Sequence, residues 1–541
     1  MYPFLAMAAR GGGTQWIDAA MKLFWWGEHT LSLADGGMLN DVDSPWTGTT
    51  VFSMIGWAQC YLVYRHVLTD EFAHQLFQRI EKAADYLYGL ESLANNNINY
   101  PITNALALEL AYRVTNKRRY SEKGAWFADI AFSVITEGDL IYGEGVPRSR
   151  ISDKGCRSID IGYNVEETLP ALALYGNLVG NTAIVDLAKR SFKAHLAFMF
   201  ADGGWDNSFG TRNFKWTWWG SRTSDGSIGG LLLFGDQEPE FARAAIKNLE
   251  LLEYSTVDAL LSGGPHYADE GQPACIHHTF EHASMLAQAL DRGLFDAIDL
   301  EAVNTARLAR ELGGPSRYYP ELATWIVNKK RYTATLTAYD WQYLEGGHVS
   351  GGTLSALFDH SLGPIFAASM GEYSLKERNN MQVPTEGVIH QCLAPRIEYI
   401  HEGETFSSIY ECDATTVMQD DRYTAGGFLW SKDGKGGSIP YELSYEFSDH
   451  SLLITATAMQ GSLVLPLISR SHEEIVEGPS SLDIIKGEGK VCLAFDSPYQ
   501  LAYGTKRIFN LVPGLQALRI DLPLEAGQVS VQIVLSEGGE L

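Results

Sequence analysis

Hydrophobic positions follow two different periods along the chain. Up to about residue 310, apolar residues recur mostly at i, i+3, i+4 and i+7, the spacing of one helix face. Clear examples are 51–68, 102–115, 182–200 and 282–295. Loops rich in glycine, aspartate and asparagine separate these helices, at 33–48, 93–101, 150–164, 202–226 and 261–275. This alternation predicts paired helices. If the pairs close into a ring, the loops at one end converge on a shared cleft.

From about residue 330 the pattern becomes that of strands. Short runs rich in β-branched and aromatic residues occur at fairly regular spacing, with Gly, Asp and Ser turns between them. Examples are 331–341, 352–358, 451–460 and 528–535. This spacing is typical of an antiparallel sandwich. We therefore expect a multidomain α+β protein, with a helical toroid at residues 1–315 and an antiparallel β-sandwich at residues 316–541.

Charge and composition narrow the classes of partner. The chain has 541 residues, of which 66 are acidic and 41 basic, giving a net charge of -25. Nucleic acid is excluded as a partner, because phosphate binding needs a basic footprint. The N-terminus has no signal-peptide pattern and we find no apolar run long enough to span a membrane, so we expect a cytoplasmic protein without a membrane partner. A homo-oligomer is compatible with the sequence. Six scattered cysteines predict free thiols.

The segment 202–226 combines aromatic and cationic side chains between glycines. Tryptophans that alternate with polar residues in such a loop are suited to stacking on sugar rings, although core packing is the plainer alternative. The cations can hold a carboxylate, and an arginine can do so through two hydrogen bonds. Solvated surface is the plainer alternative for them. The residues concerned are Trp216, Trp218, Trp219, Arg212, Lys215 and Arg222.

Three segments resemble a known class of enzyme. These are 99–124, the Asp-Gly-Gly motif at 202–204, and 346–373. They are similar to segments of the (α/α)-toroid carbohydrate enzymes, in particular the heparinase II/III-like and alginate polysaccharide lyases. The resemblance implies β-elimination at a uronic acid of a glycan, without a cofactor. A base removes the C5 proton, a neutral or cationic group stabilises the enolate, and a Tyr or His protonates the leaving oxygen.

The resemblance also implies where the site lies. Tyr163 and Asn164 open a helix ahead of the Asp-Gly-Gly motif, where such lyases place an asparagine. Asn164 has a structural alternative as a helix cap, because Glu167 follows it at the capping-box spacing. We expect His278 to take part in catalysis. We expect further substrate contacts from His266, Tyr267, His277 and His348.

Carboxylates give a competing interpretation. Val165 stands where many of these lyases have a histidine, and no tyrosine occurs between Trp205 and Trp219. Glycoside hydrolases need two carboxyl groups, and Glu166 and Asp206 are candidates, with Glu167 and Asp202 beside them. A uronide-specific hydrolase of the β-glucuronidase type is therefore the main alternative. A glycan-binding protein without catalysis is a third possibility.

One short motif points to a metal. His278, Glu281 and His282 match HxxEH, the inverzincin pattern, and place both histidines on one helix face. Matches of this length are common by chance, and no protease architecture accompanies the motif. We therefore expect no metal site.

Overall fold

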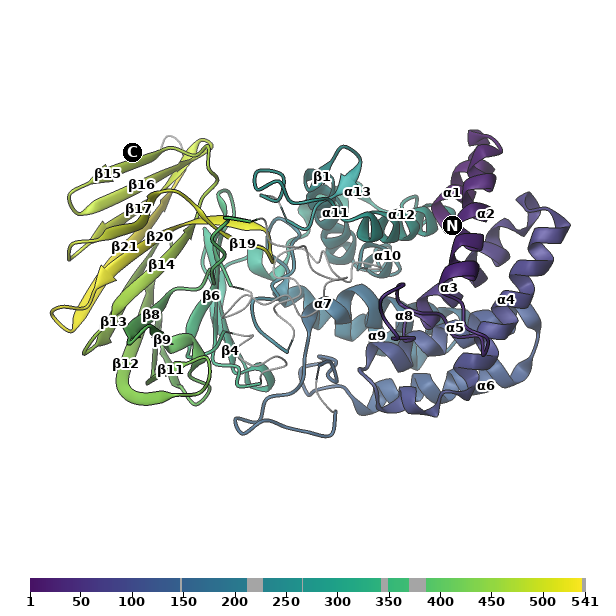
Figure 1. Ribbon diagram of the computed structural model, residues 1–541, viewed down its shortest axis with the longest axis horizontal. Coiled ribbons are helices and arrows are strands. Elements are labelled where there is room, and N and C mark those ends of the chain that lie inside the picture. The colour runs from purple at the N-terminus through teal and green to yellow at the C-terminus, as the bar shows by residue number, and fades with distance from the viewer. Residues whose placement is uncertain (146–147, 212–226, 265, 342–348, 369–385, 538–541) are drawn as a thin grey trace.

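The computed structural model describes all residues except 146–147, 212–226, 265, 342–348, 369–385 and 538–541. Helices and sheets form two bodies that lie side by side along the long axis of the molecule (Figure 1). Helix α13 (Leu300–Thr305) ends the helical part, and β3 (Gly314–Tyr319) is the first strand of the second part. The predicted division after residue 315 therefore falls inside β3.

Alternate helices of the first part form a closed ring. Helix α3 contacts α5, α5 contacts α8, α8 contacts α10, α10 contacts α12, and α12 contacts α1, which contacts α3. Each of these helices except α12 is followed in the chain by an outer helix that packs against it. The inner helices are α1 (Tyr2–Met7), α3 (Thr50–Tyr64), α5 (Asn99–Thr115), α8 (Leu169–Val179), α10 (Ser227–Leu232) and α12 (Ile276–Asp291). The outer helices are α2 (Gln15–Thr30), α4 (Asp70–Gly89), α6 (Arg118–Ala128), α9 (Thr182–His195) and α11 (Pro239–Tyr254), with α13 against α11.

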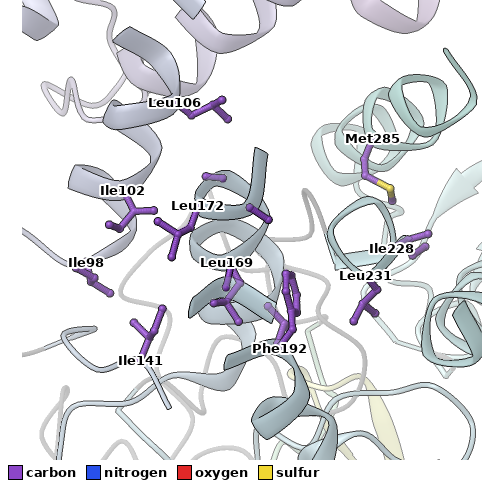
Figure 2. Close-up of a cluster of buried hydrophobic side chains, with 14 of the residues drawn as sticks. Ile98, Ile102, Leu106, Ile141, Leu169, Leu172, Phe192, Ile228, Leu231 and Met285 are labelled. Carbon is purple, nitrogen blue, oxygen red and sulfur yellow. The ribbon is translucent and has the colours of Figure 1, made fainter. Parts of the chain in front are cut away.

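Burial explains which helices are inner. Helix α5 is apolar on nearly every side and is covered on nearly every side, whereas α4 buries one face, with Phe72, Leu76, Ile80 and Leu87 at helical spacing. Side chains of neighbouring inner helices meet in one core (Figure 2) with Ile98 and Ile141 from loops and Phe192 from α9; the inner helices contribute Ile102, Leu106, Leu169, Leu172, Ile228, Leu231 and Met285. The predicted toroid of helical hairpins is confirmed.

A polar contact fastens the two ends of the ring. Asp291, the last residue of α12, accepts hydrogen bonds from Tyr2 of α1 (2.6 Å) and from Tyr64 of α3. Arg10 donates to its other oxygen at 2.6 Å. Burial opposes ionisation of Asp291, but these hydrogen bonds prevail and lower its pKa. The charge of one carboxylate therefore ties the first, second and last inner helices together.

Within its described residues, the second part contains two antiparallel sheets. The smaller sheet has the order β3-β4-β5-β6-β7, with β4 (Thr324–Asn328), β5 (Tyr332–Thr337), β6 (Thr353–Asp359) and β7 (Gly363–Ala367). The larger has the order β15-β16-β17-β21-β13-β12-β11-β9-β8-β14-β20-β18, with β10 beside β11 and β19 beside β20. Its strands are β8 (Arg396–His401), β9 (Glu404–Ser407), β10 (Thr415–Gln419), β11 (Arg422–Ser431), β12 (Gly436–Phe447), β13 (Ser451–Ala458), β14 (Ser462–Ile468), β15 (Ile475–Gly478), β16 (Ser481–Lys486), β17 (Gly489–Phe495), β18 (Gln500–Thr505), β19 (Ile508–Asn510), β20 (Leu515–Pro523) and β21 (Gln528–Ser536).

The smaller sheet lies between the helical ring and the larger sheet. Every residue of β5 and β6 is buried, because both faces of these strands are covered. Leu336 and Leu357 belong to the core between the sheets, whereas Ile326 and Phe358 belong to the core of the helical ring. Phe358 stacks on Phe200 of the helical part at a centroid separation of 4.8 Å. The predicted β-sandwich is confirmed, and one of its sheets also forms the joint with the toroid.

Candidate active site

The described parts of the loops before α3, α5, α8 and α10 gather on one rim. Trp46, before α3, contacts Tyr100 at the start of α5. The backbone of Ile98, before α5, donates to Gly143 at 3.0 Å, and Thr211 donates to Ile159 at 3.1 Å. This rim faces the sheets (Figure 1). Because helix N-termini carry partial positive charge, a rim on which inner helices begin favours an anionic ligand, even in a chain of net charge -25.

Buried polar side chains connect these loops beneath the rim. Asn99, the first residue of α5, donates its backbone N–H to Glu144 at 2.8 Å and its side-chain amide to Glu167 at 2.6 Å. All three residues are buried. A carboxylate is buried in a protein only where hydrogen-bond donors compensate the loss of its hydration. The hydrogen bonds of this network therefore fix the positions of its side chains relative to one another. It joins the start of α5 to the loop before α7 and to the turn that follows α7.

That turn departs from regular helix geometry. A single helical turn, α7 (Ile161–Tyr163), leads into a π-helical turn, η5 (Asn164–Thr168), before α8 begins. The side chain of Asp160 accepts from the backbone of Tyr163 at 3.1 Å, so Asp160 caps the helix and Asn164 lies inside it. The capping alternative for Asn164 is therefore wrong. Single π turns are frequent at functional sites, because the extra residue redirects the side chains around it.

The amide of Asn164 has one defined orientation. Its Nδ2 lies 2.8 Å from the carbonyl oxygen of Ile141 and 3.0 Å from Nε2 of His195. Nδ1 of His195 lies 2.7 Å from the carbonyl oxygen of Ser191, so Nδ1 carries the proton. Burial lowers the pKa of His195 to about 4, which keeps the ring neutral and leaves Nε2 as an acceptor. Two acceptors on one side of the amide require the NH₂ group there.

Oδ1 of Asn164 consequently points away from both partners. It is buried and has no hydrogen-bond partner within the described residues. Both side-chain polar atoms of Asn104, on the neighbouring inner helix α5, are also buried without partners in the same residues. Buried polar atoms normally find a partner, and exceptions call for an explanation such as an absent ligand. Asn164 thus offers an acceptor to an O–H or N–H group.

Two further predicted catalytic residues lie in the same turn. Tyr163 immediately precedes Asn164, and Glu166 follows two residues later. Tyr163 is 7% exposed and Glu166 is 2% exposed. The structure therefore brings together three of the five predicted catalytic residues, next to the network of Asn99 and Glu167.

Asp206, by contrast, lies in the joint between the two parts. Its Oδ2 accepts from Arg310 at 2.7 Å and from the hydroxyl of Thr335, on β5. Its Oδ1 accepts from the backbone and the hydroxyl of Ser208, at 3.1 and 2.7 Å. Asp206 and Arg310 are both fully buried. Four hydrogen bonds occupy both oxygens, so this carboxylate has the surroundings of a structural ion pair.

The Asp-Gly-Gly motif has a local structural cause. Asp202 accepts from the backbone of Gly204 at 2.9 Å, which closes the turn. Gly203 has a φ of +92° and lies against helix α11, where a Cβ would come within 2.3 Å of the carbonyl carbon of Lys247. Only glycine meets both conditions. The motif therefore fixes the turn that leads from α9 to Asp206.

His266 and Tyr267 also join the two parts. Nδ1 of His266 accepts from the backbone of Gln516, on β20, at 2.8 Å. The hydroxyl of Tyr267 donates to the backbone of Leu511. Both residues are buried, and burial together with Arg470 and Lys486 holds the pKa of His266 well below its usual value. These contacts place the pair against the larger sheet.

The histidines of α12 occupy different surroundings. Nδ1 of His278 lies 2.8 Å from the sulfur of Cys275, and His278 is 2% exposed. His277 is largely exposed and lies 4.0 Å from Glu281. His282 is buried and its Nδ1 donates to the backbone of His278 at 3.0 Å. No group of three metal-binding side chains occurs in the described part of the chain.

Seven predicted substrate-binding residues lie outside the described residues. They are Arg212, Lys215, Trp216, Trp218, Trp219, Arg222 and His348. Their proposed contacts with sugar and carboxylate stay predictions.

Sequence reasoning missed several residues of the rim. Asn99 was not among the predicted site residues, although it initiates α5 and donates to Glu167. His195 and Glu144 were not considered. The histidine at position 195 was an available signal, because it falls on the mainly apolar face of 182–200. Glu144, in an irregular segment, carried none.

Taken together, the helical toroid and the sandwich give this chain the fold of the toroid polysaccharide lyases. The fold has a solved counterpart in heparinase III, with a TM-score of 0.57 at 10% identity over 99% of this chain and 76% of that one.

Sequence comparison gives the family. Residues 1–307 match the model of the ulvan lyase N-terminal domain, and residues 316–536 match that of the ulvan lyase C-terminal domain. A broad-specificity ulvan lyase of Formosa agariphila is 33% identical over 558 aligned positions, which cover 99% of this chain and 86% of the relative. The chain belongs to the ulvan lyase family. The predicted polysaccharide lyase is thereby confirmed.

Among the described residues, no helix is long and apolar enough to cross a membrane.

Proposed function

We propose that this enzyme cleaves ulvan by β-elimination next to a uronic acid, at the rim formed by α5, α7 and η5. The observation that carries the proposed site is the fixed amide of Asn164, whose buried Oδ1 has no partner in the described part of the chain. The substrate is proposed from the relative of Formosa agariphila, a broad-specificity ulvan lyase.

The chemistry assigns different tasks to the residues of the turn. β-Elimination breaks the C5–H and C4–O4 bonds and forms a C4–C5 double bond. Tyr163, beside Asn164, is the proposed proton-transfer group: as the phenolate it takes the proton from C5, and the phenol so formed gives a proton to the departing O4. Asn164 accepts an O–H of the bound uronic acid residue through Oδ1, because its Nδ2 is already engaged with Ile141 and His195. It therefore orients the sugar rather than donating to the carboxylate.

The negative charge that develops on the carboxylate needs separate stabilisation. The helix N-termini at the rim supply part of it. The predicted cations Arg212, Lys215 and Arg222 are our candidates for the remainder. A cationic group is needed here because Glu144, Glu166 and Glu167 place three carboxyl groups beneath the same rim.

The test is ultraviolet absorbance during digestion of ulvan. We expect new absorbance from the C4–C5 double bond with the wild-type enzyme. We expect Tyr163→Phe to lower kcat about a hundredfold or more, because it keeps the ring and removes the transferable proton. Tyr88→Phe on the outer helix α4 is the matched control and should keep full activity, since Tyr88 is 39% exposed and lies on the outer layer. New reducing ends without new absorbance would instead establish hydrolysis.

A further inference from the structure

One exposed tryptophan at the rim is held in a fixed position. Trp46 is 48% exposed, although a free indole ring of this size usually packs inward. Its Nε1 donates to the hydroxyl of Tyr100 at 3.3 Å, and the two rings meet edge to face at a centroid separation of 5.8 Å. The loop backbone is tied as well, because Asn40 donates to the carbonyl oxygen of Trp46 at 2.8 Å.

A glycine allows the ring to lie close to the backbone. A Cβ on Gly48 would come within 2.7 Å of three atoms of the Trp46 indole. Any other residue at position 48 would therefore displace the ring. Tyr100 and Gly48 hold the ring in place while nearly half of the residue stays open to solvent. This is the arrangement of a preorganised stacking platform, in which little side-chain entropy remains to be lost on binding.

The platform is connected to the candidate active site by consecutive contacts. Tyr100 follows Asn99, which donates to Glu167 at 2.6 Å in the turn that contains Asn164. Trp46 therefore lies on the same rim as the proposed catalytic turn, but at the neighbouring helix start. A polymer bound at Asn164 can continue along the rim toward Trp46.

The exposed part of the indole suits a sugar, because a pyranose can place its C–H face on the ring.

From these contacts we propose that Trp46 forms a subsite that stacks on a sugar ring of the glycan, away from the bond that is cleaved. This inference rests on the proposed function. The subsite positions long substrates and contacts no reacting atom, so it acts on binding. Substrates too short to reach it gain nothing from it.

The test compares Trp46→Ala with the wild-type enzyme on polymeric ulvan and on its shortest cleavable oligosaccharide. We expect KM for the polymer to rise about fivefold to tenfold at unchanged kcat, as for the loss of one stacking contact. KM for the shortest substrate should not change. Trp46→Phe keeps a flat ring and should recover part of the loss. Equal KM changes on both substrates, or none, would overturn the subsite.

A matched control exists on the outer layer. Trp126 is 45% exposed, but Nζ of Lys123 lies 4.0 Å from its ring centroid and covers one face. Trp126→Ala should leave both KM values unchanged. Migration in native gels that contain ulvan measures binding without catalysis. If the wild-type enzyme forms no double bond, the proposed function fails, but stronger retardation of wild type than of Trp46→Ala would still support the subsite. Equal retardation would refute it.

Discussion

Two buried polar regions of this molecule differ in how completely their hydrogen bonds are made. In the joint, the four hydrogen bonds of Asp206 occupy both carboxylate oxygens, and its partner Arg310 is equally buried. At the rim, Asn164 uses its whole NH₂ group and leaves Oδ1 without a partner in the described residues. Both regions look alike in sequence, as polar residues beside glycines and aromatics.

The difference separates scaffold from site. A buried polar group whose hydrogen bonds are all made within the protein stabilises the folded state. A ligand could bind such a group only by displacing one of its partners. A fixed polar atom with no partner costs stability until a ligand supplies one. On this criterion Asp206 belongs to the scaffold and Asn164 to the candidate site. Three variants test the comparison.

The largest effect is expected at the joint. Asp206→Ala should lower the free energy of unfolding by about 3–5 kcal/mol, because it leaves the guanidinium of Arg310 buried without its carboxylate. Urea denaturation of the whole chain measures this. The control is Asp70→Ala, which removes an exposed ion pair with Arg65 and should cost far less, because water solvates both charges there. If Asp206→Ala were as stable as the control and lost only activity, the assignment of Asp206 to the scaffold would be wrong.

Sequence patterns predicted the ring and the sandwich because each depends on local periodicity. Helix α5 and strand β6 are recognisable from their own residues, whichever elements pack on them. The role of Asp206 was not accessible in this way, since it depends on Arg310, over a hundred residues later in the chain. A loop aspartate that pairs with a distant arginine has the same local sequence as one in a cleft.

The candidate site was predicted in part. Tyr163, Asn164 and Glu166 were identified through a resemblance, and the structure places them in one buried turn. The π turn itself could not be predicted, because the same residues also fit a regular helix. His266 and Tyr267 were expected at the substrate, yet they contact β20 and Leu511. A histidine in a polar loop can bind substrate or join two parts of a protein, and only its tertiary contacts distinguish the two roles.

The second prediction concerns the unpartnered amide. Asn164→Ala should lower kcat/KM on ulvan by about a hundredfold, the usual effect of losing one oriented hydrogen bond in an active site. Its stability should fall by less than that of Asp206→Ala, because the two hydrogen bonds of Nδ2 that are lost join uncharged groups, whereas Asp206→Ala leaves a buried charge without its partner. Asn248→Ala is the control, since Asn248 is equally buried but donates to Gly203 at 2.9 Å in the turn below. It should lose stability and retain activity. If Asn248→Ala lost activity and Asn164→Ala lost only stability, then Asn248 would belong to the site and Asn164 to the scaffold.

The smallest effect concerns the histidine that orients Asn164. The pKa of His195 is about 4 in the folded protein, below the value of about 6.5 expected for an unfolded chain. The unfolded state therefore binds the proton more tightly, and stability falls as the pH drops from about 6.5 toward 4. His195→Gln cannot take up this proton but can still accept from Asn164. Between pH 6.5 and 5, its stability should fall by about 2 kcal/mol less than that of the wild-type enzyme.

His282→Gln provides the matched control for this measurement. Burial also lowers the pKa of His282 to about 4, and its Nδ1 likewise donates to a backbone carbonyl. Both variants should therefore flatten the pH dependence of stability to a similar extent. Only His195→Ala, which removes the acceptor for Nδ2, should also lower activity at neutral pH, because the Asn164 amide can then rotate. Full activity of His195→Ala would show that the contact with Ile141 alone fixes the amide, and the comparison would then rest on Asn164 without His195.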